Sequence, residues 1–124
     1  VIDALNSKVK SLKNSKILVL GIAYKKNVDD MRESPAVVLM ELLKEKGASV
    51  DYSDPYIPVF PKIRNHSFDL KSIELTSAKI HEYDLLLLTT DHDLFNYDYI
   101  QKHSKLIVDT RGVYTNKYSN VVRA

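Results

Sequence analysis

Apolar and polar positions divide the chain into short blocks, and four of these blocks predict β-strands. Strands are predicted at 16–21, where 17–20 is apolar, and at the apolar runs 85–88 and 106–108. These runs have the length of strands buried on both faces, as in a parallel sheet. A fourth strand is predicted at 48–53, where apolar and polar residues alternate before a break at Asp54-Pro55.

Helical spacing lies between these predicted strands. Ser34-Pro35 opens the clearest helix, because serine caps free N–H groups and proline suits the first turn. Gly47 suits the end of this helix, where a left-handed residue is common. Shorter helices are predicted over 75–83 and over 96–103, the second of them capped by Asn96.

Three other segments complete the pattern. The proline-containing segment 55–69 is a predicted loop, and the residues after Arg111 form a predicted polar tail. Apolar residues at spacings of three and four predict an amphipathic helix at the start of the chain: Ile2, Leu5, Val9 and Leu12. We interpret 1–14 as the end of a longer interdomain helix, and 15–124 as the domain that follows it.

The alternation of strands and helices predicts an α/β fold. We expect a parallel sheet with helices on both faces, a Rossmann-like three-layer sandwich. In such sheets ligands bind beyond the carboxyl ends of the strands. Those ends bring four groups to one edge of the predicted sheet: Tyr24 with Lys25, Asp54, 89–93, and Arg111.

Composition limits the possible functions. The chain has 124 residues, enough for one domain with a core, and a hydrophobic share of 44%. The net charge of +2 is too small to indicate nucleic acid, and no apolar stretch approaches a membrane span. The absence of cysteine excludes disulfides, thiolate metal sites and a cysteine nucleophile. We expect a cytoplasmic protein, and because the chain opens at Val1, a piece of a longer one.

The residues after the first predicted strand suit an anionic ligand. Tyr24, Lys25 and Arg32 lie in this segment, directly before a helix start whose N–H groups also favour anions. The plain alternative is a solvated loop whose basic groups pair with Asp29-Asp30 and Glu33. A glycine-rich phosphate turn is absent, because Gly21 stands alone.

Two further clusters each have a competing interpretation. Arg111 ends the last predicted strand and points toward the same edge, but an Asp109–Arg111 pair could simply tie strand to loop. The triplet 91–93, Asp-His-Asp, resembles a metal site, yet adjacent residues rarely converge on one ion. We expect no metal and no catalytic residue here, with Asp91 or Asp93 capping a turn and His92 exposed.

Residues 16–36 carry a turn of the form Gly-x-Ala-aromatic-Lys, an acidic pair, and Arg-Glu-Ser-Pro-Ala. Together with 52–55, 89–92 and 108–111, this segment resembles the C-terminal UDP-binding domain of the UDP-glucose/GDP-mannose dehydrogenase family. The combination of 54–58 with 90–93 is most similar to the branch that oxidises UDP-N-acetyl-hexosamines, such as UDP-N-acetylglucosamine.

The resemblance implies a role within a larger enzyme of polysaccharide biosynthesis. In this family NAD, held mainly by an N-terminal Rossmann domain, oxidises C6 of a UDP-sugar to a carboxylate. By the family pattern Tyr24, Lys25 and Arg111 contact the UDP-sugar, here UDP-N-acetylglucosamine or UDP-N-acetylmannosamine, and Arg32 reaches toward NAD. The first helix then belongs to a central region that joins the domains and forms a homodimer. The family's catalytic cysteine lies outside this chain, so the isolated chain is expected to be inactive.

Some residues depart from the family pattern, and two other functions stay open. Gly112 stands where many members have asparagine, and Tyr24 where many have phenylalanine. The first alternative is a receiver-like phosphoacceptor domain, which Asp29-Asp30, Asp54 and Thr89 mimic. Against it, the acidic pair lies far beyond the first strand and the last strand ends in arginine rather than lysine. The second is a structural dimerisation domain with a vestigial site.

Overall fold

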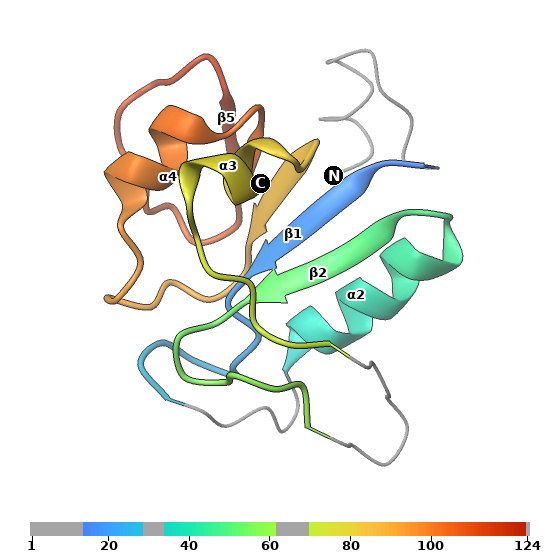
Figure 1. Ribbon diagram of the computed structural model, residues 1–124. Coiled ribbons are helices and arrows are strands. Elements are labelled where there is room, and N and C mark those ends of the chain that lie inside the picture. The colour runs from blue at the N-terminus through green and yellow to red at the C-terminus, as the bar shows by residue number, and fades with distance from the viewer. Residues whose placement is uncertain (1–13, 29–33, 62–69, 124) are drawn as a thin grey trace.

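The computed structural model describes residues 14–28, 34–61 and 70–123. Figure 1 shows a central sheet with α2 on one side and α3 and α4 on the other. The elements follow in chain order: β1 Lys16–Leu20, α2 Pro35–Glu45, β2 Ser49–Ser53, α3 Ser77–His81, β3 Leu85–Leu88, α4 Tyr97–His103, β4 Ile107–Asp109 and β5 Val121–Arg123. The predicted α/β sandwich of three layers is confirmed.

The sheet has five strands in the order β2-β1-β3-β4-β5, and every pair is parallel. The chain runs outward from β1 to β2 and then returns past β1 to begin β3. This order has its topological switch point between β1 and β3, where the connections leave toward opposite faces. Doubly wound sheets hold their ligands in the crevice beyond this point.

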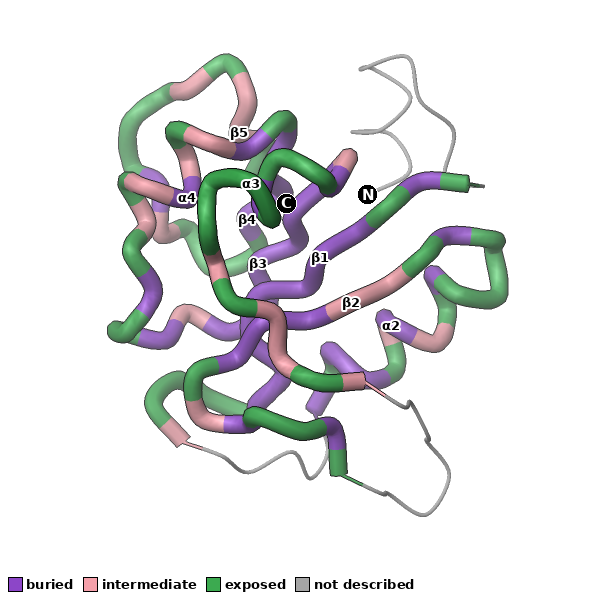
Figure 2. The backbone as a smooth tube through the Cα atoms, in the orientation of Figure 1, coloured by how far each residue is buried: buried purple, intermediate pink, exposed green. Residues whose placement is uncertain are grey.

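The two faces of the sheet bury separate clusters of side chains. Val19 of β1 lies in register with Tyr52, Leu87 and, one strand further, Val108, and this row packs against α2. The neighbouring row packs against α3 and α4, and consists of Leu18, Leu86 and Ile107. The unbroken apolar runs of the sequence reflect this burial on both faces, which Figure 2 shows along the central strands.

Helix α2 begins and ends where the sequence predicts. The Ser34 hydroxyl accepts a hydrogen bond from the N–H of Ala36 at 3.3 Å, and Pro35 is the first helical residue. The same hydroxyl donates to the carbonyl of Ile22 at 2.7 Å, so the helix start is tied to the chain leaving β1. Gly47 has a φ of +93°, the left-handed conformation that helix ends favour.

The C-terminal segment corrects one prediction. It is not a polar tail, because Val121–Arg123 forms β5 at the edge of the sheet. Asn120 fixes this strand by donating to the carbonyls of Gln101 at 2.8 Å and Ser104 at 2.9 Å. The helix predicted at 75–83 is also shorter than expected, since α3 covers only Ser77–His81.

The first helix of the sequence prediction lies at 1–13, outside the described residues, and so does 62–69 of the predicted loop. The boundary drawn between 1–14 and 15–124 therefore stays a prediction. Within the described part of the chain, no helix combines the length and apolar character that a membrane span requires.

Candidate functional site

Four chain segments leave the carboxyl ends of neighbouring strands and meet at one edge of the sheet. They are 21–28 after β1, 54–61 after β2, 89–95 after β3 and 110–112 after β4. In Figure 1 the segments that follow the β1 and β2 arrows emerge together at the same end of the sheet. This is the switch-point edge, where the sequence places its candidate ligand-binding residues.

The crossing at the end of β1 is very close. Gly21 has a φ of +81°, and a Cβ atom there would lie 2.5 Å from the Cβ of Thr90. The Thr89 hydroxyl donates to the carbonyl of Gly21, and the Thr90 hydroxyl donates to that of Ala23 at 2.8 Å. Glycine is required here because both the backbone conformation and the available space exclude a side chain.

A buried carboxylate, Asp54, bridges the ends of β2 and β1. It accepts hydrogen bonds from the N–H of Ile22 at 2.9 Å and from the N–H of Tyr56 at 2.8 Å. Its Oδ2 also lies 2.9 Å from Nε2 of His92. Burial alone would raise the pKa of Asp54, but these hydrogen bonds outweigh burial and hold the pKa below its ordinary value. Asp54 is therefore an anion at neutral pH.

His92 is fully buried, which corrects the prediction of an exposed histidine. Its Nδ1 accepts the backbone N–H of Asn27 at 2.7 Å, so the ring proton resides on Nε2 and is donated to Asp54. The ring also packs against Tyr56 and Phe95, with centroids 4.7 Å and 5.6 Å away. The neutral imidazole thus joins the ends of β2 and β3 to the turn after β1.

Asn27 closes this turn. Its φ of +62° is unusual for a residue with a side chain, and hydrogen bonds on both sides compensate for the strain. Its side-chain Nδ2 donates to the Asp93 carboxylate at 2.7 Å, and its side-chain Oδ1 accepts the backbone N–H of Asp93 at 2.9 Å. Asp93 therefore pairs with Asn27 instead of capping its own turn. Lys26 lies 4.0 Å from the same carboxylate, an exposed pair that contributes little stability.

Tyr24 and Lys25 lie between the fixed positions of this turn. Tyr24 is 49% exposed and Lys25 is exposed. Among the residues that the structure describes, neither side chain has a hydrogen-bond or ion-pair partner. Hydrogen bonds of the Ala23 carbonyl and of Asn27 hold the turn. The phenol of Tyr24 and the ammonium group of Lys25 are therefore available to a ligand.

Arg111 reaches the same edge from β4. Its Nε donates to the carbonyl of Thr89 at 2.8 Å, which places the guanidinium across the end of β3. The alternative of an Asp109–Arg111 side-chain pair is wrong in its detail. Asp109 does tie strand to loop, but its carboxylate accepts the backbone N–H groups of 111, 112 and 114, each at 2.9 Å.

The last predicted site residue, Arg32, lies outside the described residues, together with Asp29 and Asp30. The strand ends in the sequence predict Asp54 and 89–93 at the ligand edge, but not the bond between Asp54 and His92. The available signal was a histidine and an aspartate following the two strands that flank β1. The role of Asn27 had no such signal, because it depends on a left-handed backbone conformation.

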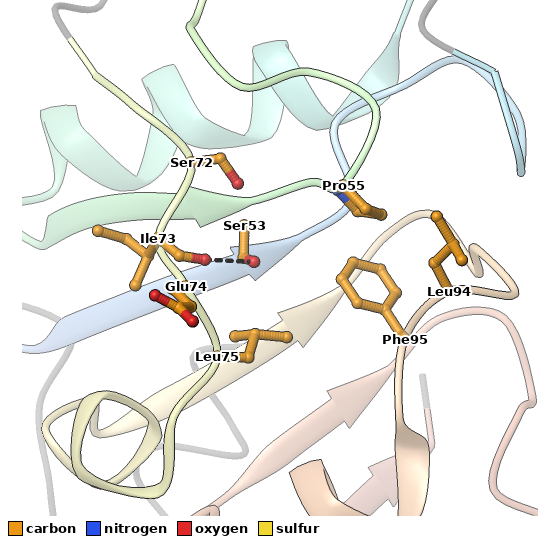
Figure 3. A pocket seen from close by; sticks show the side chains of 8 residues that line it. All are labelled: Ser53, Pro55, Ser72, Ile73, Glu74, Leu75, Leu94 and Phe95. Carbon is orange, nitrogen blue, oxygen red and sulfur yellow. Dashed lines mark hydrogen bonds between the residues drawn. The ribbon is translucent and has the colours of Figure 1, made fainter.

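A cavity of about 300 Å³ lies beside this edge, on the side of α3 and α4 (Figure 3). Its lining is mostly apolar and its one charged group is a carboxylate, so it is a poor phosphate site. It contains none of the predicted ligand residues. The lining consists of Ser53, Pro55, Ser72, Ile73, Glu74, Leu75, Leu94 and Phe95.

The fold and this edge define a doubly wound α/β domain whose switch point lies between β1 and β3. The chain matches the family model described as the UDP binding domain of the UDP-glucose/GDP-mannose dehydrogenase family, over residues 18–116. It therefore belongs to that family, as the resemblance predicted.

Named relatives agree with this assignment. The chain is 29% identical over 121 residues to the NDP-N-acetyl-D-galactosaminuronic acid dehydrogenase of Ralstonia nicotianae, covering 94% of this chain and 27% of that protein. It is 32% identical over 123 residues to the UDP-N-acetyl-D-mannosamine dehydrogenase of Methanococcus vannielii, covering 91% and 27%. The solved UDP-N-acetyl-mannosamine dehydrogenase Cap5O of Staphylococcus aureus superposes with a TM-score of 0.66 at 28% identity, covering 98% and 29%.

Proposed function

We propose that this chain is the nucleotide-sugar-binding part of an NAD-dependent UDP-sugar 6-dehydrogenase. The chain spans about a quarter of the length of the relatives it matches, so the reaction belongs to the larger protein. The proposed reaction is the oxidation of C6 of the sugar to a carboxylate. UDP-N-acetylglucosamine and UDP-N-acetylmannosamine are the substrates proposed, which the hexosamine named for the Methanococcus relative supports.

The exposed cations at the switch-point edge carry this proposal. Lys25 has no partner among the described residues, and Arg111 engages only its Nε there. An ammonium group binds phosphate as a point charge, and the two free guanidinium nitrogens suit bidentate binding of a phosphate or sugar oxygen. Tyr24 adds a hydroxyl and an aromatic face. We propose that Tyr24, Lys25 and Arg111 together contact the UDP-sugar.

The turn after β1 does not carry the glycine-rich sequence with which a strand-to-helix turn binds a dinucleotide. Gly21 is its only glycine. The Ser34 hydroxyl already accepts an N–H of the first turn of α2. We therefore place NAD mainly on a domain outside this chain, with Arg32 reaching it from the cleft. The catalytic cysteine lies outside the chain as well, and the complete enzyme is proposed to be a homodimer.

Substitution of Lys25 in the present chain tests the proposal. The wild-type chain should bind UDP-N-acetylglucosamine in the high micromolar to millimolar range, because it offers only part of a site. Lys25→Ala should weaken binding about tenfold to a hundredfold, the effect of losing one charge-assisted hydrogen bond. NMR titration measures both affinities.

Lys26→Ala is the matched control. It removes the same charge from the same turn, but Lys26 lies toward Asp93. We expect its affinity to stay within about threefold of the wild type, since exposed pairs of this kind are weak. An equal loss in both variants would indicate nonspecific attraction to the turn, and would contradict a dedicated contact by Lys25.

A further inference from the structure

The turn that presents Tyr24 and Lys25 is fixed on both sides. Before it, the carbonyl of Ala23 accepts the Thr90 hydroxyl at 2.8 Å. After it, the N–H of Asn27 donates to Nδ1 of His92 at 2.7 Å. Both fixing groups come from the segment that follows β3. The backbone that carries the two exposed side chains is therefore held by the segment after β3, and not by contacts of those side chains.

His92 is itself firmly held, so it can act as a fixed point. Its ring has no exposed surface, and its Nε2 is bonded to Asp54. Its carbonyl accepts the Tyr97 hydroxyl at 2.6 Å. The aromatic rings of Tyr56 and Phe95 pack against the imidazole. Movement of the imidazole would break contacts with several elements at once.

We propose that His92 is a positioning residue for the nucleotide-sugar site, holding the Tyr24–Lys25 turn in its binding conformation through the N–H of Asn27. This inference rests on the proposed function of that turn. The neutral ring serves because one nitrogen accepts from Asn27 while the other donates to Asp54. A turn that is already ordered loses less entropy when the ligand binds, which increases affinity without a direct contact.

Two substitutions separate the two nitrogens of the ring. His92→Asn retains an oxygen near the place of Nδ1, so it can still accept the N–H of Asn27, but it loses the bond to Asp54. His92→Gln retains an amide nitrogen near the place of Nε2, so it can still donate to Asp54, but it leaves Asn27 without its acceptor. The pair distinguishes holding the turn from supporting the core.

The experiment measures three properties of the wild type and both variants. UDP-N-acetylglucosamine affinity comes from NMR titration, order of the turn from exchange of the Asn27 amide, and stability from thermal melting. We expect H92Q to bind at least tenfold more weakly and to exchange the Asn27 amide at least tenfold faster. The Ile22 amide, which bonds to Asp54, should exchange unchanged in H92Q.

H92N should bind within about threefold of the wild type, because it keeps an acceptor for the N–H of Asn27. It should melt at a lower temperature, because it loses the bond to Asp54 and the ring packing against Tyr56 and Phe95. H92N would then be the less stable variant and H92Q the weaker binder. A histidine with a merely structural role would instead lower stability and affinity in the same order. The inference is overturned if H92Q binds as tightly as the wild type, or if affinity follows melting temperature in both variants. Should H92N fail to fold, an unchanged Asn27 exchange rate in H92Q overturns it equally. Absence of binding by the wild type rejects the proposed function instead, and Asn27 exchange still decides whether His92 holds the turn.

Discussion

Asp54 connects three of the segments that form the ligand edge. It is 1% exposed, and its oxygens accept from two backbone N–H groups and from His92. A carboxylate in this position links the ends of neighbouring strands through hydrogen bonds. The same burial makes it unsuited to accept a phosphoryl group, which argues against the receiver-like alternative, since a phosphoacceptor must be reached by the donor.

Asp54→Asn should lower the free energy of unfolding by roughly 2–3 kcal/mol at pH 7. One oxygen becomes an amino group that faces a backbone N–H, leaving a buried donor unsatisfied. Because the pKa of Asp54 is lowered by folding, its stabilising contribution is present above the unfolded pKa of about 3.9. It is lost as the pH falls further, through the folded pKa.

Urea unfolding between pH 7 and pH 3 checks this prediction. The difference between the wild type and Asp54→Asn should be full at pH 7 and should shrink below about pH 4. Asp98→Asn, an exposed residue in the first turn of α4, is the control and should cost a few tenths of a kcal/mol at most. A pH-independent difference would show that the charge of Asp54 is not the stabilising feature.

Residue positions were predictable only as far as strand ends determine them. The sequence brought Tyr24, Lys25, Asp54 and Arg111 to one edge, because parallel strands share their carboxyl end. It could not predict that Asp54 meets His92, since that bond depends on which strands flank β1 in the sheet. An expected exposed histidine therefore became the most buried polar group of the site.

At the scale of elements, the chain leaving β1 lies in close contact with the segment after β3, and this contact fixes the backbone at the ligand edge. The Thr89 and Thr90 hydroxyls both bond carbonyls of the chain leaving β1. Ser34 at the start of α2 bonds a third, that of Ile22. These side chains satisfy backbone groups that the end of the strand would otherwise leave unpaired.

Gly21→Ala and Gly112→Ala compare two glycines with similar positive φ angles, +81° and +71°. Gly112 has a φ of +71°, and the nearest atom to an added Cβ is 4.0 Å away, so only the conformational cost of roughly 1–2 kcal/mol applies. Gly21→Ala adds the clash with Thr90, for a total of about 2–5 kcal/mol. Urea unfolding measures both losses, and equal values would contradict the close crossing.

Elements with strong local signals were predicted well. The apolar strands and the Ser34 and Asn96 caps follow from burial and hydrogen bonding within a few residues. The short edge strand β5 was missed because Val121–Arg123 is only partly buried and follows a polar segment. Its place depends on Asn120, which bonds the end of α4, a contact distant in sequence.

At the scale of the whole molecule, strand order does not decide function. The order β2-β1-β3-β4-β5 is common to doubly wound domains with different ligands. The family match and the exposed cations support a nucleotide sugar. The remaining interpretation, a dimerisation domain with a vestigial site, differs in predicting no ligand at all.

Arg32→Ala in the full-length dehydrogenase tests the division between the two ligands. We expect the KM for NAD to rise about tenfold and the KM for the UDP-sugar to stay unchanged, because Arg32 is proposed to face the cofactor cleft. Lys25→Ala should have the reverse effect. Steady-state kinetics at saturating levels of the other substrate gives both constants, and an effect of Arg32→Ala on the sugar alone would contradict this division.

We propose above all that the switch-point edge binds a nucleotide sugar. The most direct test is an NMR titration of the labelled 124-residue chain with UDP-N-acetylglucosamine, in which the shifted resonances are mapped onto the structure. We predict saturable shifts centred on Tyr24, Lys25 and Arg111, with smaller shifts at Asn27, which closes the same turn. Addition of N-acetylglucosamine without the nucleotide should leave these resonances in place. Shifts centred on the apolar cavity around Leu94 or on His81, or no shifts at millimolar ligand, would contradict it.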